Sequence, residues 1–457
     1  MTDISRFVAV RPHERQIAWQ ELGFTAFFHF GINTFNNREW GTGEEYSKSY
    51  EPVSLDTDQW CRAVKAAGVK ACILTAKHHD GFCLWDTAYT EHSVMSSKKP
   101  VDVVALFVES CRRFGLKAGI YLSPWDMHEP TYGTGAAYDD FYCGQLEELT
   151  TRYGELYSLW FDGACGEGHD GRVQQYDWER YFAIIRKNQP HAAISIMGPD
   201  VRWIGNEAGI TRESEWSVVS TRLLDTEAIA AKSQHADGLM PLSPMYEDLG
   251  SVSALEGEPG LCWYPAEVDV SIRPGWFYHP EENDKLRSVE DLMQIYESSV
   301  GGNAVLLLNI PPDTDGRINV ADVKRLKELG NALRTVYGEG LCAGAVVRDS
   351  DGRDISYILA DDDEFWRGGL ESASISVGFS GKKTIRRLVL CEQIRMSQRI
   401  ESFEIIAETA GKRNRIFEGT TVGFKKICTF EPVEADSLLI NITNSRQWPT
   451  LRFVGVY

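Results

Sequence analysis

Hydrophobic positions along this chain fall into short runs separated by longer amphipathic segments, and this alternation continues to about residue 340. Short apolar runs are typical of strands buried on both faces, whereas an apolar position every three to four residues is typical of helices. Strands are predicted at residues 25–32, 70–76, 117–122, 156–162, 192–197 and 303–310, with weaker candidates at 215–219 and 266–272. Helices are predicted at residues 58–67, 101–114, 138–153, 176–187 and 320–337.

Strands that alternate with helices predict a parallel sheet whose strands are joined by crossover helices. Seven or eight such units over residues 1–340 indicate an α/β domain of the (β/α)8-like TIM barrel type. Thr57 or Asp58 is expected to cap the first long helix. The stretch at residues 233–265, rich in Gly and Pro, is expected to form an elaborated loop over the barrel mouth.

The pattern changes near residues 338–344, where the helical periodicity stops. Short alternating segments at residues 402–407, 438–442 and 451–456 are typical of half-buried strands. Residues 341–457 are therefore predicted to form a C-terminal antiparallel β-sandwich domain. Its expected role is packing, ligand binding or completion of the active site. A length of 457 residues also favours two domains over one.

Composition and charge argue against several classes of protein. The formal net charge of −19 disfavours binding to nucleic acid or to an anionic membrane, since both need a basic surface. Ten scattered Cys residues without a Cys-x-x-Cys pair disfavour a zinc ribbon or dithiol site. No apolar run reaches the roughly 18 residues of a membrane span, and the first residues lack a signal-peptide core. A cytoplasmic protein is expected, with export open if a leader has been removed.

The predicted strand at residues 156–162 ends on a single carboxylate, Asp162, which small and flexible residues follow. In a β/α barrel the chemistry takes place at the C-terminal ends of the strands. Asp162 is therefore a candidate catalytic residue in the barrel mouth. The alternative is an Asp that begins a turn or caps the next helix, as Asp-Gly often does.

Other polar side chains fall at the ends of predicted strands. His29 lies among aromatic residues, His78 and His79 follow the second strand, and Tyr121 ends the third. A single His in an apolar strand is usually a core residue with its hydrogen bonds satisfied. Two adjacent His are harder to explain that way, and one of them can face the mouth while its neighbour holds a structural partner. Hydrogen bonding to a polyhydroxylated ligand fits them, and it also fits the 13 Trp and 18 Tyr.

A metal site is the competing interpretation of these histidines. Zinc takes three or four ligands, and His29, His78 or His79 with Asp80 or Asp162 could supply them. The chain has no His-x-His and no His-Glu-x-x-His motif. The hydrogen-bonding interpretation predicts that no metal or other cofactor is needed.

Five short motifs resemble those of glycoside hydrolase family 29, the retaining α-L-fucosidases. They match in order and approximate spacing across residues 20–340: Phe28-His29-Phe30-Gly31, Arg38-Glu39-Trp40, Lys77-His78-His79-Asp80-Gly81-Phe82, Tyr121-Leu122-Ser123 and Leu159-Trp160-Phe161-Asp162-Gly163. The resemblance implies a β/α barrel with a C-terminal β-sandwich. It also implies that Asp162 is the catalytic nucleophile. The fucose pocket that it implies is lined by His29, Glu39, Trp40, His78, His79, Tyr121, Trp160 and Trp276.

The segment at residues 202–209 resembles the acid/base segment of the branch that cleaves α-1,3/1,4-linked fucose from branched oligosaccharides. The resemblance places the acid/base on Glu207, with Glu213 and Glu215 as nearby alternatives. The expected activity is that of a retaining exo-α-L-fucosidase on a fucosylated oligosaccharide. A broader fucosidase, a metal-dependent hydrolase and a sugar-binding barrel without turnover remain open. The sequence does not indicate an oligomeric state.

Overall fold

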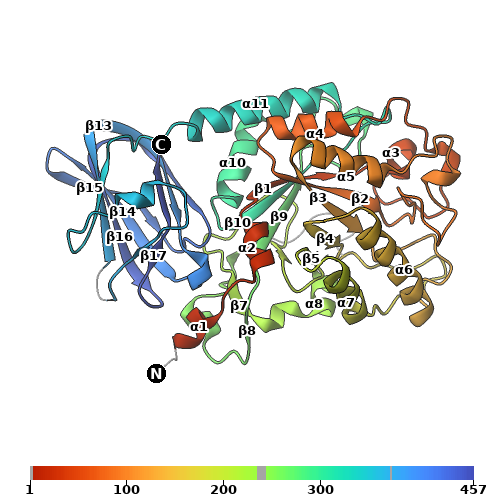
Figure 1. The fold of residues 1–457 in the computed structure, drawn as a ribbon, viewed down its shortest axis with the longest axis horizontal. Helices are drawn as coiled ribbons and strands as arrows, with labels where there is room; N and C mark the ends of the chain where they lie inside the picture. Colours follow the sequence, from red (N-terminus) through yellow and green to blue (C-terminus); the bar gives the residue numbers. More distant parts are fainter. Residues whose placement is uncertain (1–3, 234–242, 371–372) are drawn as a thin grey trace.

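The computed structural model describes residues 4–233, 243–370 and 373–457. Its first part is a barrel of parallel strands surrounded by helices (Figure 1). The sheet order is β5-β4-β3-β2-β1-β10-β9-β6, and a parallel bridge between Ser195 and Val201 brings its two edges together, so the barrel is nearly closed. The strands are β1 Phe24–Phe28, β2 Ala71–Lys77, β3 Lys117–Leu122, β4 Ser158–Phe161, β5 Ala193–Ile196, β6 Arg202–Trp203, β9 Ala266–Ser271 and β10 Ala304–Asn309.

The five predicted helices are confirmed. Asp56 caps the first of them through a hydrogen bond to the Gln59 amide, so the cap lies one or two residues before the predicted position. The long helices are α4 Thr57–Ala66, α5 Val103–Phe114, α6 Ala136–Arg152, α7 Trp178–Asn188, α10 Val289–Ser299 and α11 Val320–Tyr337. The shorter ones are α1 Ser5–Ala9, α2 Glu14–Gln20, α3 Ile32–Asn36, α8 Thr226–Ser233 and α9 Val252–Leu255. None of the helices within the described ranges is long and apolar enough to cross a membrane.

The prediction that residues 215–219 form the sixth barrel strand is wrong. Its end belongs to β7 Val218–Ser220, which pairs antiparallel with β8 Leu261–Trp263 outside the barrel. Val218 packs there against Phe7 and Ile394. An apolar run predicts burial but not the partner, and the true sixth strand, β6, is too short to produce a pattern. Residues 234–242 of the expected mouth loop lie outside the described residues.

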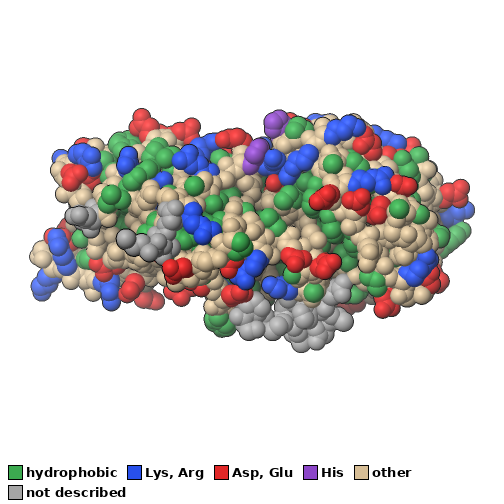
Figure 2. All heavy atoms as spheres, turned by 90° about the horizontal axis from the view of Figure 1, so that it is seen from below, with side chains coloured by type: hydrophobic (Ala, Val, Ile, Leu, Met, Phe, Trp, Pro, Cys, Tyr) green, Lys and Arg blue, Asp and Glu red, His purple; other side chains and the backbone are tan. Residues whose placement is uncertain are grey.

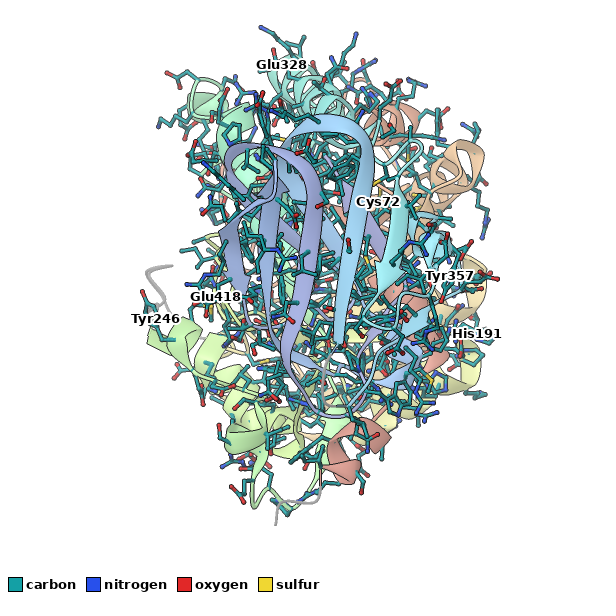
Figure 3. The ribbon with its side chains drawn as sticks, turned by 90° about the vertical axis from the view of Figure 1, so that its left-hand side faces the viewer. Cys72, His191, Tyr246, Glu328, Tyr357 and Glu418 are labelled. Atoms are coloured by element: carbon teal, nitrogen blue, oxygen red, sulfur yellow. The ribbon has the colours of Figure 1, made fainter. Side chains whose placement is uncertain are left out.

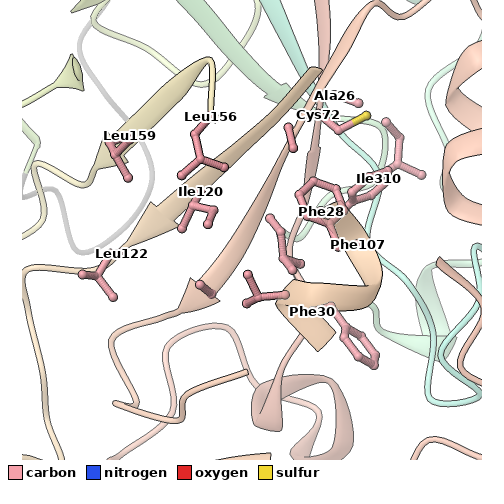
Figure 4. Close-up of a cluster of buried hydrophobic side chains, with 14 of the residues drawn as sticks. Ala26, Phe28, Phe30, Cys72, Phe107, Ile120, Leu122, Leu156, Leu159 and Ile310 are labelled. Carbon is pink, nitrogen blue, oxygen red and sulfur yellow. The ribbon is translucent and has the colours of Figure 1, made fainter. Parts of the chain in front are cut away.

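Successive side chains of a strand point to opposite faces, and this alternation builds two layers. Phe27, Tyr121 and Trp160 point into the barrel, whereas their sequence neighbours pack against the helices. Figure 4 shows part of the outer layer, which includes Ala26, Phe28, Phe107, Ile120, Leu122 and Leu159. The residue two positions beyond an inward-facing one points inward too. His29 and Asp162, two positions beyond Phe27 and Trp160, therefore reach the barrel mouth.

The predicted C-terminal antiparallel β-sandwich is confirmed, and its long strands run in front of the barrel in Figure 3. The change of domain falls between α11 and β11, although the boundary at residue 340 stays a prediction. The two longest strands of the domain, β13 and β16, pair with each other antiparallel. The register of this pairing shifts near Gly378 and again near Ile385. The strands are β11 Val346–Asp349, β12 Trp366–Arg367, β13 Ala373–Cys391, β14 Ile400–Thr409, β15 Lys412–Gly419, β16 Lys426–Ser445, β17 Thr450–Leu451 and β18 Phe453–Val456.

The two domains are held together by apolar packing, as between Val218 and Ile394, and by polar contacts. Arg387 of the sandwich pairs with Glu297 of the barrel at 2.8 Å, and Gln398 accepts a hydrogen bond from the Ser217 amide. Figure 2 views the molecule from below and shows acidic and basic side chains interspersed on that face, without a continuous basic patch among the described residues.

Candidate active site

A cavity of about 730 Å³ opens at the C-terminal ends of the barrel strands. Nine of the ten predicted site residues line it, namely His29, Glu39, Trp40, His78, His79, Trp160, Asp162, Glu207 and Trp276. The tenth, Tyr121, lies directly behind the wall, where its ring stacks on His78 and Trp160. The folded chain therefore brings together residues from at least six separate segments.

Asp162 directly follows β4 and points into the cavity, as the alternation from Trp160 requires. Its Oδ2 accepts a hydrogen bond from the Tyr121 hydroxyl at 3.0 Å, and its Oδ1 accepts one from the Ala164 amide at 2.8 Å. Burial, together with the adjacent charge of Asp162, raises the pKa of Tyr121 well above its usual value. The phenol therefore keeps its proton and donates. Asp162 is held in one orientation at the cavity floor.

The hydrogen bonds of Asn309 set the tautomer of His29. The Asn309 amide nitrogen donates to the Trp276 carbonyl at 2.8 Å, so its Oδ1 faces the His29 ring and accepts from Nδ1 at 2.9 Å. Burial lowers the pKa of His29 to about 3, which keeps the ring neutral. With the proton on Nδ1, the His29 Nε2 is left as an acceptor for a ligand hydroxyl.

Ser123 sets the tautomer of His79 in the same way as Asn309 sets that of His29. The Ser123 hydroxyl donates to the Trp125 carbonyl at 2.6 Å, so it accepts from the His79 Nδ1 at 2.7 Å. The neutral ring then presents an unprotonated Nε2, 3.7 Å from Asp162 Oδ2. Burial lowers the pKa of His79 despite the neighbouring carboxylates. A ligand hydroxyl placed between these two acceptors can donate to one of them.

His78 also lines the cavity, so both adjacent histidines face the barrel mouth rather than one of them. They follow the end of β2 in a turn, where strand alternation no longer applies. Burial lowers the pKa of His78 well below its usual value, and its buried Nδ1 has no hydrogen-bond partner among the described residues. An unpartnered Nδ1 favours the tautomer with the proton on Nε2. His78 is then a donor to the ligand, where His29 and His79 are acceptors.

Glu207 sits on a short loop after β6 that Asn206 holds in shape. Asn206 Oδ1 accepts from the Ala208 and Ile210 amides at 3.0 and 3.2 Å, and its Nδ2 donates to the Ile210 carbonyl at 2.8 Å. Gly205 has a φ of 107°, a conformation that side chains disfavour. The Gly205-Asn206-Glu207 segment therefore forms a fixed turn that directs the Glu207 carboxyl into the cavity.

The Glu207 carboxyl differs from Asp162 in its electrostatic surroundings. Burial by the cavity walls and the negative charges of Asp162 and Glu39 raise the pKa of Glu207 to about 7, against a hydrogen bond from Trp276 Nε1 at 3.1 Å. Water still reaches the side chain through the open mouth. One cavity thus holds a carboxylate fixed by donors and a carboxyl that keeps its proton up to near-neutral pH. That pairing is the one acid–base chemistry requires.

Comparison with known proteins identifies this arrangement. The family model described as Alpha-L-fucosidase matches residues 13–339, which span the whole barrel. The chain belongs to the α-L-fucosidase family. It is 37% identical to Alpha-L-fucosidase 1 of Arabidopsis thaliana over 98% of this chain and 87% of that protein. The family resemblance drawn from the sequence motifs is confirmed.

Solved structures of the α-L-fucosidase family share the fold. A putative α-L-fucosidase from Bacteroides ovatus superposes with a TM-score of 0.88 at 41% identity, covering 99% of this chain and 75% of that one. A GH29 fucosidase of Ruminococcus gnavus solved in complex with fucose superposes with a TM-score of 0.84 at 29% identity, covering 98% and 95%. The barrel with its C-terminal sandwich is therefore the architecture of this family.

Glu213 and Glu215 do not line the cavity of this fucosidase. Glu213 is exposed, and Glu215 is 1% exposed and forms ion pairs with Arg202 and with Arg212, the latter at 3.3 Å. Arg212 also donates to the Ile204 carbonyl at 3.1 Å. Glu215 therefore clamps the base of the Glu207 loop and is structural.

Glu215→Gln is expected to lower the free energy of unfolding by about 3–5 kcal/mol, because two buried guanidinium groups lose their countercharge. Denaturant unfolding measures this loss, with Glu213→Gln as an exposed control that should change it by less than about 0.5 kcal/mol. The folded fraction of Glu215→Gln should keep the pH dependence of the wild type. Unchanged stability with an altered pH profile would instead make Glu215 the acid/base.

Glu39 positions a neighbouring segment of the fucosidase as well as lining the cavity. Its carboxylate accepts hydrogen bonds from the Trp276 and Phe277 amides at 2.8 and 3.2 Å and contacts His279 Nε2 at 2.5 Å. Trp276 is thereby held with its indole against Glu207. Trp40, which is 42% exposed, packs edge-on against His79 at the rim.

Sequence reasoning missed two buried carboxyls on β9. Glu267 accepts a hydrogen bond from Trp160 Nε1 at 2.6 Å, and Asp269, which lines the cavity, accepts one from Trp203 Nε1 at 2.5 Å. Burial raises the pKa of Glu267 to about 7, and burial with the charges of Glu207 and Glu267 raises that of Asp269 well above its usual value. The two carboxyls orient the two indoles. The sequence signal that could have found them is the alternation Glu-Val-Asp-Val-Ser at residues 267–271, within the weaker strand candidate, because alternation places both carboxyls on one face of the strand.

One group of side chains could hold a metal ion. The nearest ligand atoms of His78, His79 and Asp162 lie within 4.8 Å of one another. Asp80, the other carboxylate considered, instead accepts hydrogen bonds from Asn33 at 2.8 Å and from the Phe82 amide at 2.7 Å. His78, His79 and Asp162 have geometry compatible with a cation, and the same atoms suit the hydroxyls of a sugar.

Proposed function

We propose that this fucosidase is a retaining, exo-acting hydrolase in which Asp162 is the nucleophile and Glu207 the acid/base. The observation that carries the proposal is the pair of unlike carboxyls in one cavity, one held by Tyr121 and the other with a pKa of about 7. A retaining glycosidase needs such a pair about 5–5.5 Å apart.

Each step of the reaction has a group to perform it. Asp162 attacks the anomeric carbon while Glu207 gives its proton to the glycosidic oxygen, and the leaving saccharide departs as an alcohol. Glu207, now a carboxylate, then takes a proton from water as the water oxygen bonds to the anomeric carbon. The bond to Asp162 breaks, and free fucose and both carboxyls are restored.

The hydrogen-bonding pattern of the histidines supports fucose as the ligand. His29 and His79 present acceptor nitrogens and His78 a donor, which suits a set of neighbouring hydroxyls. Aromatic rings such as Phe27 and Trp160 provide apolar surface for the methyl group of a 6-deoxy sugar. A structure of the Ruminococcus gnavus relative contains bound fucose.

The proposed substrates are branched oligosaccharides with α-1,3- or α-1,4-linked fucose, on the basis of the Gly205–Gly209 segment that carries Glu207. Release of fucose from a Lewis trisaccharide, from 2′-fucosyllactose and from an aryl α-fucoside tests this specificity. Release from the trisaccharide alone is expected. Equal release from all three favours a broad-specificity fucosidase, and no release from any contradicts hydrolase activity.

A metal-dependent hydrolase is the second candidate, because His78, His79 and Asp162 could bind a cation. Hydrolysis of the aryl α-fucoside is expected to stay within about twofold of the untreated enzyme after dialysis against a chelator, because the proposed chemistry uses two carboxyls and no Lewis acid. The control is dialysis without chelator. Loss of activity that added zinc restores would favour the metal-dependent candidate.

A further inference from the structure

A second cavity of about 280 Å³ adjoins the first and shares four lining residues with it: Glu207, Pro274, Trp276 and Arg287. Asp162 lines only the first cavity, so the second lies toward the proton donor and away from the nucleophile. In a glycosidase the proton donor faces the leaving group. The second cavity is therefore placed to receive the saccharide that departs from fucose, and this assignment rests on the proposed function.

Three cationic side chains line this second cavity, Arg273, Lys285 and Arg287, whereas Glu207 is its one lining acid among the described residues. Such a concentration of positive charge is unexpected in a chain with a net charge of −19. Neutral saccharides offer hydroxyls, which do not require cations. The lining suits a ligand with a negative charge.

The three cations differ in how far other residues already neutralise them. Arg273 is 2% exposed and bonded to Asp322, and its Nη1 has no hydrogen-bond partner among the described residues. Arg287 donates through Nη1 to Asp291 at 2.9 Å. Lys285 is exposed, and within the described part of the chain its ammonium group has no ion pair within 4 Å.

We propose that this cavity is an anion-selective subsite for the leaving group, with Lys285 and Arg287 binding an acidic substituent of the oligosaccharide. The substituent is either the carboxylate of an acidic sugar or a sulfate ester, since guanidinium and ammonium groups bind both. The enzyme then acts preferentially on acidic fucosylated glycans. Because this charge contact exists before and during the reaction, its main effect is on KM.

The test compares a neutral Lewis trisaccharide with its 3′-sialylated, 3′-sulfated and 6-sulfated forms. An exposed ion pair contributes about twofold to fivefold in affinity, so kcat/KM for an acidic form is expected to exceed the neutral value by about three- to tenfold at low salt. At 1 M salt the advantage should disappear, because the screening length falls to about 3 Å. Preference for the sialylated form alone identifies a carboxylate site, and preference for the sulfated forms alone identifies a sulfate site.

Charge reversal at Lys285 provides the second measurement. Lys285→Glu should lower the ratio of kcat/KM between acidic and neutral glycans by about tenfold or more, as a repulsion replaces an attraction. The matched control is Lys117→Glu, which makes the same charge change at the exposed start of β3, at the opposite end of the barrel. The proposal is overturned if no acidic form is preferred, or if both variants change the ratio equally. Hydrolysis of an aryl α-fucoside by the wild type monitors the proposed function separately, because that substrate carries no acidic substituent for Lys285 and Arg287 to bind.

Discussion

Asp162→Asn is expected to lower kcat for an aryl α-fucoside by a factor on the order of 10⁴ or more, because the amide cannot form the covalent intermediate. Fucose should still bind, since His29, His78, Tyr121 and the aromatic walls are unchanged. Steady-state kinetics and calorimetric titration with fucose measure the two effects. The matched control is Asp170→Asn, an exposed carboxylate on the same loop, which should leave kcat within about twofold.

A second variant tests whether Asp162 acts by attack on the sugar. Asp162→Gly with added azide is expected to produce β-fucosyl azide from an aryl fucoside, because azide attacks the anomeric carbon from the vacated side as the phenolate leaves. Full activity of the Asn variant would refute the nucleophile assignment. Loss of fucose binding by the Asn variant would show that the substitution had damaged the site itself.

Glu207→Gln is expected to remove the proton donor, with a loss of about 10²–10⁴-fold in kcat/KM for a Lewis trisaccharide. An aryl fucoside with an acidic phenol needs little protonation, so its first step should be much less affected. The pH profile provides a further test. A raised pKa means that Glu207 is protonated below about pH 7 and loses its proton above it. Wild-type kcat/KM should therefore fall as the pH rises through about 7, and this basic limb should vanish in the variant.

Glu213→Gln is the control for Glu207→Gln, because Glu213 is an exposed carboxyl six residues further along the chain that does not line the cavity. It should keep both the activity and the basic limb. A basic limb that persists in Glu207→Gln would transfer the acid role to another carboxyl, and Asp269, which also lines the cavity with a raised pKa, would be the first to examine.

The C-terminal sandwich influences the site indirectly. The residues that line the two cavities all precede residue 288 within the described part of the chain. Gln398 of the sandwich donates to the Glu215 carbonyl at 3.2 Å, and Asn303 donates to the same oxygen at 2.9 Å. These bonds support the Arg202–Glu215 clamp beneath the Glu207 loop. The sandwich therefore stabilises the segment that carries Glu207, and none of its described residues lines either cavity.

Local sequence patterns determined the barrel class, most of its strands and helices, and the placement of His29, His78 and Asp162 at strand ends. Such patterns suffice because a buried parallel strand is apolar along its length, so a polar residue at its end is conspicuous. The motif series also identified the family, since its residues recur at set distances along the chain.

Only the tertiary structure decided which carboxyl beyond β6 faces the cavity, which run forms the sixth strand, and what Asp269 and Glu267 contact. Glu207 and Glu215 are alike as residues in a polar segment, but one lies among acids in a cavity and the other between two arginines. The proton affinity of a carboxyl depends on charges and burial supplied by remote parts of the chain. Which remote groups lie close to a given carboxyl is set by the tertiary fold, and the spacing of residues along the chain does not reveal it.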